Sequence, residues 1–290
     1  MGTYAVTGSA SGMGAAVVER LVADGHRVIG VDIKGADVTA DLSTAHGRRE
    51  AAAAVLELAG GVLDGAVLAA GLGPAPGKDR PRLIVEVNYR GVVELLDAWR
   101  PALARAERAK VVVFSSNSTT TVPAVPRGVV RSLLADDTEK ALRTLRRLGR
   151  LGPTFAYAAS KVAVSHWVRR NAVTLDWAGA GIRLNALAPG AILTPLLEQQ
   201  LSTPAEAKRI RAFPVPIGGF GDPAHLAAWV VFMLSDAADF LCGSVVFVDG
   251  GSDAWFRATD WPRPVPARRV PGYVRRMAQF RSYKKAVRKG

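Results

Sequence analysis

The stretch TYAVTGSASGMGAAVVERLVADGHRVIGVD, residues 3–32, decides the fold of this chain. Residues 3–8 form a short apolar run that ends at a glycine, which is typical of a buried strand. Residues 13–25 carry apolar side chains at helical spacing and stop at a glycine. A second apolar run, residues 27–32, ends in an acid. The stretch therefore predicts a strand, a glycine-rich turn, a helix and a second strand.

The same alternation continues along the rest of the chain. Further strands are predicted over residues 63–71, 110–116, 182–190 and 244–251. Further helices are predicted over residues 44–61, 83–106, 155–181 and 223–235. Short apolar strands that alternate with helices favour a parallel sheet covered on both faces. The predicted fold class is therefore α/β, a single Rossmann-type doubly wound parallel sheet flanked by helices.

The glycine-rich turn has the spacing G-x-x-x-G-x-G, with Gly8, Gly12 and Gly14 between the first strand and the first helix. Such glycines allow a sharp turn, approach of the backbone to a pyrophosphate, and close packing of helix on strand. The helix N-terminus behind them favours a phosphate. Asp32 ends the second strand, where an acid holds an adenosine ribose through its 2′-hydroxyl. NAD is therefore the favoured cofactor and NADP the less favoured one, although Lys34 nearby argues for NADP. An ordinary strand–helix turn is the alternative interpretation of the glycines alone.

Tyr157 and Lys161 stand four residues apart in a predicted helix, which places both side chains on one face. A free phenol has a pKa of about 10, poorly matched to neutral pH. A lysine cation favours the phenolate and lowers that pKa, so the pair suits acid–base chemistry. The same spacing arises by chance in many helices.

Taken in order, the glycine spacing, the AAG at 69–71 and Tyr157-x-x-x-Lys161 resemble the short-chain dehydrogenase/reductase family over about residues 3–253. Four stretches are similar to its bacterial 3α-hydroxysteroid dehydrogenase/carbonyl reductase group: GVDIKGADVTADLSTAHGR, LDGAVLAAGLGP, VNYRGVVELLDA and RLNALAPGA. The resemblance implies an NAD(H)-dependent oxidoreductase that interconverts a secondary or aryl alcohol and its carbonyl compound. A non-catalytic dinucleotide-binding sensor or scaffold on the same fold is the alternative.

The resemblance also implies a catalytic set, namely Ser116, Tyr157, Lys161 and Asn88. Tyr157 would be the general acid or base, Ser116 would hold the substrate oxygen, and Asn88 resembles a proton-relay element. Ser115, Ser118 and Thr119–Thr121 compete for the position of the catalytic serine. A buried asparagine in a helix also commonly satisfies backbone groups.

The cofactor contacts that the resemblance implies are Gly8, Ser11, Gly12, Met13, Gly14, Asp32, Asp41, Leu42, Ala70, Gly71, Tyr157, Lys161, Pro189, Gly190, Ile192 and Thr194. Asp41 and Leu42 would contact the adenine, and the turn at 189–194 would hold the nicotinamide carboxamide. Members of the family usually have Asn-Asn-Ala-Gly where this chain has LAAG, residues 68–71. That departure puts a hydrogen bond of the central sheet in doubt.

Ser116 and Tyr157 are separated by an insertion of about residues 118–152 inside a predicted domain of residues 1–255. Residues 135–149 predict an amphipathic helix, with acids at its start, leucines along one side and a glycine at its end. We expect the insertion to shape the substrate entrance or a subunit interface, or to be a surface embellishment. The segment 196–220 corresponds to the family's substrate lid, and its apolar residues fit a bulky apolar substrate such as a hydroxysteroid.

Residues 256–290 form a basic Pro/Arg-rich extension. Arg257–Gly290 contains eight Arg, three Lys and one acid, which gives +10 of the chain's net charge of +13. The prolines at 262, 264, 266 and 271 oppose regular structure, although residues 272–289 could form a short amphipathic helix. Packing on a neighbouring subunit or a solvated state is favoured; contact with nucleic acid or an anionic membrane is the less favoured interpretation.

The whole-chain composition limits the class of protein. The longest apolar runs fall short of the ~18–20 residues that span a bilayer, and the N-terminal residues enter a predicted strand at once, so a cytoplasmic protein is expected. The chain has one cysteine, Cys242, and four scattered histidines, so neither a disulfide nor a metal site is predicted. The resemblance implies a small-molecule substrate and a homo-oligomer, either a dimer or a tetramer.

Overall fold

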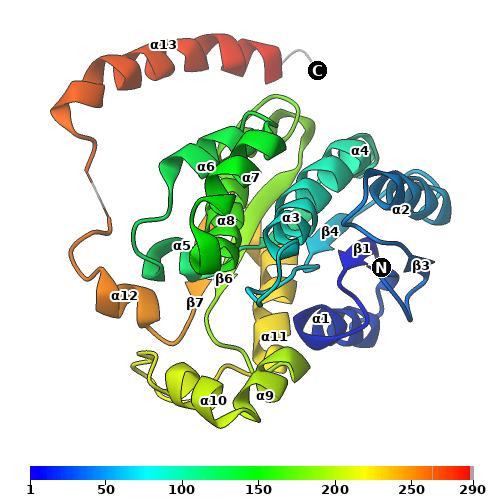
Figure 1. Cartoon of the computed structure of the whole chain (residues 1–290). Helices are drawn as coiled ribbons and strands as arrows, with labels where there is room; N and C mark the ends of the chain where they lie inside the picture. Colours follow the sequence, from blue (N-terminus) through cyan, green and yellow to red (C-terminus); the bar gives the residue numbers. More distant parts are fainter. Residues whose placement is uncertain (263, 288–290) are drawn as a thin grey trace.

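The computed structural model describes residues 1–262 and 264–287 (Figure 1). Within these residues, seven strands form one sheet in the order β3-β2-β1-β4-β5-β6-β7, and every neighbouring pair is parallel. The strands are β1 (Thr3–Thr7), β2 (Arg27–Asp32), β3 (Val38–Thr39), β4 (Gly65–Leu68), β5 (Lys110–Phe114), β6 (Arg183–Pro189) and β7 (Val245–Val248). The predicted fold class is confirmed. The sequence pattern missed β3 because two residues are too short to show periodicity.

Helices cover both faces of the sheet (Figure 1). One face carries α1 (Gly12–Ala23) and α11 (Pro223–Leu234), and the other carries α2 (Ala45–Leu58), α4 (Gly91–Arg105) and α8 (Gly152–Asn171). Side chains alternate between the faces along each strand. On β1, Ala5 therefore belongs to the core under α2, α4 and α8, whereas Val6 belongs to the core under α1 and α11.

The predicted helix of residues 83–106 is divided in the structure. It consists of α3 (Arg80–Val85), the π-helical turn η1 (Glu86–Arg90) and α4. π-helical turns inside helices occur frequently at functional sites. This turn contains Asn88, one of the predicted catalytic residues, and its side chain is buried.

The insertion is more helical than the sequence pattern predicted. It contains α5 (Ser118–Thr121), α6 (Arg127–Leu133), α7 (Thr138–Arg146) and the 3₁₀ turn η2 (Gly149–Leu151). The predicted helix of residues 135–149 corresponds to α7, which is shorter because Asp137 caps it by accepting a hydrogen bond from the Lys140 N–H at 3.0 Å. Leu142 and Leu145 are buried, and α6 and α7 pack against α8. α6 was not predicted.

The remaining helical elements are η3 (Ala178–Ala180), α9 (Pro195–Leu201), α10 (Pro204–Arg211), η4 (Asp236–Ala238), α12 (Ser252–Phe256), η5 (Ala267–Arg269) and α13 (Val270–Val287). α13 contains Pro271, which the sequence analysis expected to oppose regular structure; it lies in the first turn, where its missing N–H costs no helical hydrogen bond. The Tyr283 hydroxyl of α13 donates to the Thr174 carbonyl at 3.4 Å. Among the described helices, none has the length and apolar character to cross a membrane.

Candidate active site

The glycine-rich turn joins β1 to α1 at the carboxyl edge of the sheet. Gly8 has φ +70°, a left-handed conformation that favours glycine, and a Cβ there would lie 2.8 Å from the Ala70 nitrogen. A Cβ on Gly14 would lie 2.0 Å from the Gly8 carbonyl oxygen, so only glycine lets α1 start this close to the turn. The N-terminus of α1 therefore faces a cavity built from close-packed backbone, which suits a phosphate group.

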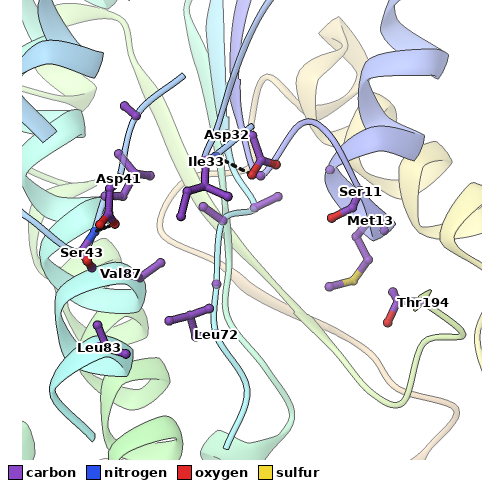
Figure 2. A pocket seen from close by; sticks show the side chains of 18 of the residues that line it. Ser11, Met13, Asp32, Ile33, Asp41, Ser43, Leu72, Leu83, Val87 and Thr194 are labelled. Atoms are coloured by element: carbon purple, nitrogen blue, oxygen red, sulfur yellow. Dashed lines mark hydrogen bonds between the residues drawn. The ribbon is translucent and has the colours of Figure 1, made fainter. Parts of the chain in front are cut away.

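A cavity of about 550 Å³ opens in front of this turn (Figure 2). Its walls come from the glycine-rich turn, the end of β2, residues 40–43, residues 69–72, helix α3 and the start of α9. The predicted cofactor contacts that line it are Gly8, Ser11, Gly12, Met13, Gly14, Asp32, Asp41, Leu42, Ala70, Gly71 and Thr194. The structure thus brings together residues that are separated by up to 186 positions in the sequence.

Other lining residues were not predicted, namely Ile33, Ala40, Ser43, Ala69, Leu72, Arg80, Leu83, Val87 and Pro195. Most of them adjoin a predicted contact in the sequence. Ile33, Ser43 and Leu72 each directly follow a predicted contact, so their position in the sequence could have identified them. Arg80, Leu83 and Val87 come from α3 and η1, and no motif marked them.

Asp32 is placed at the cavity wall by backbone hydrogen bonds (Figure 2). Its Oδ2 accepts from the Ala10 N–H at 2.9 Å, and its Oδ1 accepts from its neighbour Ile33 at 2.7 Å. The carboxylate is therefore fixed between the glycine-rich turn and the end of β2.

Five predicted cofactor contacts do not line this cavity: Tyr157 and Lys161, which belong to α8, and three residues of the 189–194 turn. Pro189 is the last residue of β6, and Gly190 and Ile192 line a separate hollow beside α11. Ile192 forms an isolated parallel bridge with Gly221. Thr194, only two residues after Ile192, does line the main cavity, so the 189–194 turn connects the two hollows.

The predicted catalytic pair Ser116 and Tyr157 is brought together by β5 and α8. The two side chains lie close enough together for the Ser116 hydroxyl to act on the Tyr157 phenol. The Ser116 hydroxyl also accepts a hydrogen bond from the Ser118 N–H at 3.1 Å, and Ser116 is 6% exposed. Burial raises the pKa of the Tyr157 phenol above its usual value, and the neighbouring Ser116 hydroxyl partly offsets that rise. The sequence analysis expected Lys161 to lower the pKa of Tyr157, whereas in the protein chain by itself this pKa is raised.

Four of the five competing hydroxyl groups have other partners, whereas the buried Ser118 hydroxyl has no hydrogen-bond partner among the described residues. The Ser115 hydroxyl is hydrogen-bonded to the Ser165 hydroxyl at 2.7 Å, which directs it into the packing of α8. Thr119, Thr120 and Thr121 donate their hydroxyls to backbone carbonyls of the same turn. Ser116 is therefore the hydroxyl that the turn presents to Tyr157.

Lys161 lies one turn after Tyr157 on α8 and is 5% exposed. Its Nζ donates to the Phe114 carbonyl at the end of β5 at 2.7 Å. Burial lowers the pKa of this ammonium to about 8. A Cβ on Gly71 would lie 3.7 Å from Nζ, so the lysine reaches the wall of the cavity.

The buried side chain of Asn88 holds the backbone of Leu72. Its Oδ1 accepts from the Leu72 N–H at 2.7 Å, and its Nδ2 donates to the Leu72 carbonyl at 3.0 Å. The side chain therefore satisfies backbone groups, which was the alternative interpretation, and it positions a cavity residue. The proton-relay role stays a prediction.

The loop at LAAG, residues 68–71, is held by hydrogen bonds from its backbone to Thr7. The Thr7 hydroxyl accepts from the Ala70 N–H at 3.1 Å, and the Thr7 carbonyl accepts from the Ala69 N–H at 3.2 Å. Thr7 thus fixes the loop that carries Ala70 and Gly71 into the cavity wall.

Comparison with known proteins gives the class. A family model described as the NAD dependent epimerase/dehydratase family matches residues 4–189, and one described as enoyl-(acyl carrier protein) reductase matches residues 147–253. The 3-alpha-hydroxysteroid dehydrogenase/carbonyl reductase of Comamonas testosteroni is 39% identical over 90% of this chain and 100% of its own length. The cis-4-hydroxycyclohexanecarboxylate dehydrogenase of Sinomonas cyclohexanicum is 31% identical over 86% of this chain and 95% of its own length.

A solved structure supports the same assignment. The crystal structure of the 3-alpha-hydroxysteroid dehydrogenase from Pseudomonas sp. B-0831 complexed with NADH has a TM-score of 0.82 and 44% sequence identity, and the match covers 89% of this chain and 99% of that chain. The chain is an oxidoreductase with a Rossmann-type fold. It belongs to the short-chain dehydrogenase/reductase family, as the sequence motifs predicted.

Proposed function

We propose that the chain is an NAD(H)-dependent dehydrogenase that interconverts a secondary or aryl alcohol and its carbonyl compound, with a bulky apolar substrate such as a hydroxysteroid. The observation that carries the proposal is that Ser116 lies beside Tyr157, one helical turn from buried Lys161, whose Nζ approaches Gly71 of the cavity wall. The hydroxysteroid dehydrogenases among the relatives support the substrate class.

The cavity residues fit a dinucleotide. The glycine-rich turn leaves no room for a Cβ on Gly8 or Gly14, so the backbone approaches a pyrophosphate closely. The Asp32 carboxylate would accept hydrogen bonds from the hydroxyls of the adenosine ribose. It would also repel the 2′-phosphate of NADP, which favours NAD over NADP. We assign the remaining contacts as the family resemblance implies: Asp41 and Leu42 to the adenine, Ala70, Gly71 and Lys161 to the ribose units, and Pro189, Gly190, Ile192 and Thr194 to the carboxamide end.

A bound nicotinamide ring would donate or accept the hydride at the substrate carbon. The Tyr157 hydroxyl donates its proton to the carbonyl oxygen during reduction, and its phenolate accepts the alcohol proton during oxidation. Ser116 donates a hydrogen bond to the same oxygen and so stabilises its developing charge. The raised pKa of Tyr157 keeps the phenol protonated at neutral pH, which suits reduction. Oxidation needs the positive charge of Lys161 to favour the phenolate.

An assay of NAD and NADP reduction over a panel of hydroxysteroids and aryl alcohols tests this proposal. We expect turnover with at least one hydroxysteroid and a preference for NAD. A protein that binds NADH yet reduces no carbonyl and oxidises no alcohol in the panel would be a dinucleotide sensor or scaffold, and that result would overturn the proposed activity.

We also propose that the enzyme is a homo-oligomer, as the family resemblance implies, and that it acts in the cytoplasm. Sedimentation velocity of the full chain would distinguish a dimer or tetramer from a monomer. Two interpretations of the sequence stay predictions: that the domain ends at residue 255, and that the basic extension packs on a neighbouring subunit or stays solvated. Salt-dependent binding to nucleic acid or anionic vesicles, lost on truncation near Ala258, would contradict the second of these predictions.

A further inference from the structure

We propose that Arg48 is a positioning residue for the adenine end of the cavity: its buried guanidinium holds the backbone of the Asp41–Ser43 segment, which forms one cavity wall. This inference rests on the proposed dinucleotide function. It concerns a residue that touches neither the reacting groups nor the cavity surface itself.

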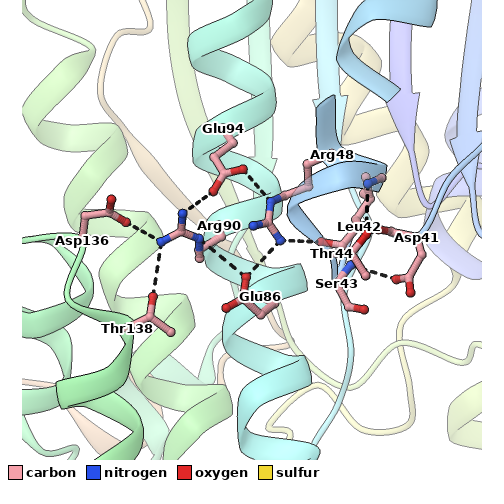
Figure 3. Close-up of polar contacts among 11 residues, drawn as sticks. Asp41, Leu42, Ser43, Thr44, Arg48, Glu86, Arg90, Glu94, Asp136 and Thr138 are labelled. Carbon is pink, nitrogen blue, oxygen red and sulfur yellow. Dashed lines mark hydrogen bonds and ion pairs between the residues drawn. The ribbon is translucent and has the colours of Figure 1, made fainter. Parts of the chain in front are cut away.

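Arg48 lies in the first turns of α2, and its side chain is only 2% exposed. Its Nη1 donates to the Leu42 carbonyl at 3.0 Å (Figure 3). The same nitrogen lies 3.0 Å from Oε2 of Glu86, and Nε lies 2.6 Å from Oε2 of Glu94. One guanidinium thus joins the cavity wall to the π-helical turn η1 and to α4.

This arrangement needs an arginine. A buried charge is tolerated when its partners compensate it, and here two carboxylates do so. The planar guanidinium presents several donors in fixed directions, whereas a lysine ammonium is a compact point charge on a flexible stem. A lysine could keep the charge balance with Glu86 and Glu94 but could not hold the Leu42 carbonyl in the same geometry.

The wall that Arg48 holds is supported by α2 in two further ways. A Cβ on Gly47 would lie 2.2 Å from the Asp41 carbonyl oxygen, so glycine is needed for this close approach. The Thr44 hydroxyl donates to that carbonyl at 3.1 Å and accepts from the Gly47 N–H at 3.0 Å. The loop is therefore seated on the N-terminal turn of α2, and Arg48 fixes its middle residue.

Arg90 offers a matched control. It pairs with the same carboxylates, at 3.5 Å to Glu86 and 2.7 Å to Glu94. Its other contacts go to the insertion rather than to the cavity wall: its Nη1 lies 2.6 Å from Oδ1 of Asp136 and 3.4 Å from the Thr138 hydroxyl (Figure 3). Arg48 and Arg90 thus share the same two carboxylates, but Arg48 contacts the cavity wall and Arg90 contacts the insertion.

Loss of the Arg48 contact should therefore affect one half of a dinucleotide. Leu42 and Asp41 line the cavity on the side of α2, whereas Tyr157 and Lys161 come from α8. A displaced loop weakens binding of the adenosine half and leaves the nicotinamide half in place. A merely structural role of Arg48 would weaken both halves.

The test compares Arg48→Lys and Arg90→Lys with the unaltered full-length protein by calorimetry, using ADP-ribose and reduced nicotinamide mononucleotide as probes. For Arg48→Lys we expect the Kd of ADP-ribose to rise about tenfold. That rise corresponds to the loss of roughly one hydrogen bond from a charged donor. The Kd of reduced nicotinamide mononucleotide should stay within about twofold, because that ligand lacks the adenosine half. For Arg90→Lys both dissociation constants should stay within about twofold.

A folded Arg48→Lys variant with unchanged ADP-ribose affinity, or with equal losses for both probes, would overturn the inference. If circular dichroism shows that this variant is unfolded, Glu94→Gln takes its place, because it removes the charge that orients Nε while Arg48 remains. The same selective loss for ADP-ribose, about threefold, is then expected, and an unchanged or unselective result overturns the inference. Failure of the unaltered protein to bind NADH or NADPH would instead contradict the proposed function.

Discussion

The side chains of Ser116 and Tyr157 lie together although an insertion of some three dozen residues separates them in the chain. Ser116 lies just after β5, and Tyr157 lies in the second turn of α8. The packing of α8 on the sheet therefore brings the two side chains together. The helices α6 and α7 pack on α8 and leave this geometry intact.

Adjacent serines provide a test of the serine assignment. Ser116→Ala should lower kcat/KM about 10²-fold, because the substrate oxygen loses a donor. Ser115→Ala should leave kcat/KM nearly unchanged and reduce the free energy of unfolding by about 1 kcal/mol, because its hydrogen bond with Ser165 and its long one to the Lys161 carbonyl are lost. Steady-state kinetics and urea unfolding check both variants. A larger kinetic loss in Ser115→Ala would reverse the assignment.

The close approach at Gly14 predicts a large effect from a single methyl group. Gly14→Ala places a Cβ 2.0 Å from the Gly8 carbonyl, so the turn must shift, and we expect NADH affinity to fall at least about tenfold or the protein to lose stability. Gly128→Ala in α6 is the control: a Cβ there meets nothing within 4 Å, and stability should rise by up to about 1 kcal/mol. Equal behaviour of the two variants would argue against the role of the glycine-rich turn.

Asp32 should determine the choice between NAD and NADP. In Asp32→Ala we expect the KM for NAD to rise about tenfold, because the ribose hydroxyls lose their acceptor. The KM for NADP should fall, because the repulsion of its 2′-phosphate is removed. Lys34→Ala should leave the KM for NAD unchanged. The hypothesis would be wrong if Asp32→Ala kept the cofactor preference of the unaltered protein.

The buried Lys161 predicts a pH dependence of stability. Its pKa is about 8 in the folded chain and 10.5 in its ordinary state. Between these values the unfolded chain binds a proton that the folded chain has released, so stability rises with pH by at most about 1.4 kcal/mol per unit. We expect the unaltered protein to gain stability relative to Lys161→Met from pH 8 to 9.5. Below pH 8 the difference should be constant. A difference that falls with rising pH would contradict the burial of this ammonium.

The fold was predictable because it depends on local patterns. Apolar runs ending at glycine marked β1 and β4, and helical spacing marked α1 and α8. Ser116, Tyr157, Lys161 and Asp32 were named from motif spacing and the family resemblance, and their roles stay predictions. The short strand β3 and the helix α6 escaped because they are too short to show a period.

Long-range contacts were not predictable. The carbonyl of Leu42 is held by Arg48, and the carboxylates that pair with Arg48 follow some forty residues later. Likewise, the hydrogen bonds between the Asn88 side-chain amide and the Leu72 backbone depend on where η1 packs against the loop after β4. The sequence pattern also gave the wrong direction for the pKa of Tyr157 in the chain alone, because burial outweighs the effect of the Ser116 hydroxyl.

The central claim is that Tyr157 transfers the proton in a nicotinamide-dependent reaction. The most direct measurement is the rate of NAD reduction by Tyr157→Phe with the best alcohol of the substrate panel, together with its Kd for NADH. We predict a rate at least about 10³-fold lower than that of the unaltered protein, with NADH affinity unchanged within about twofold. A Tyr157→Phe variant that retains the full rate would contradict the claim.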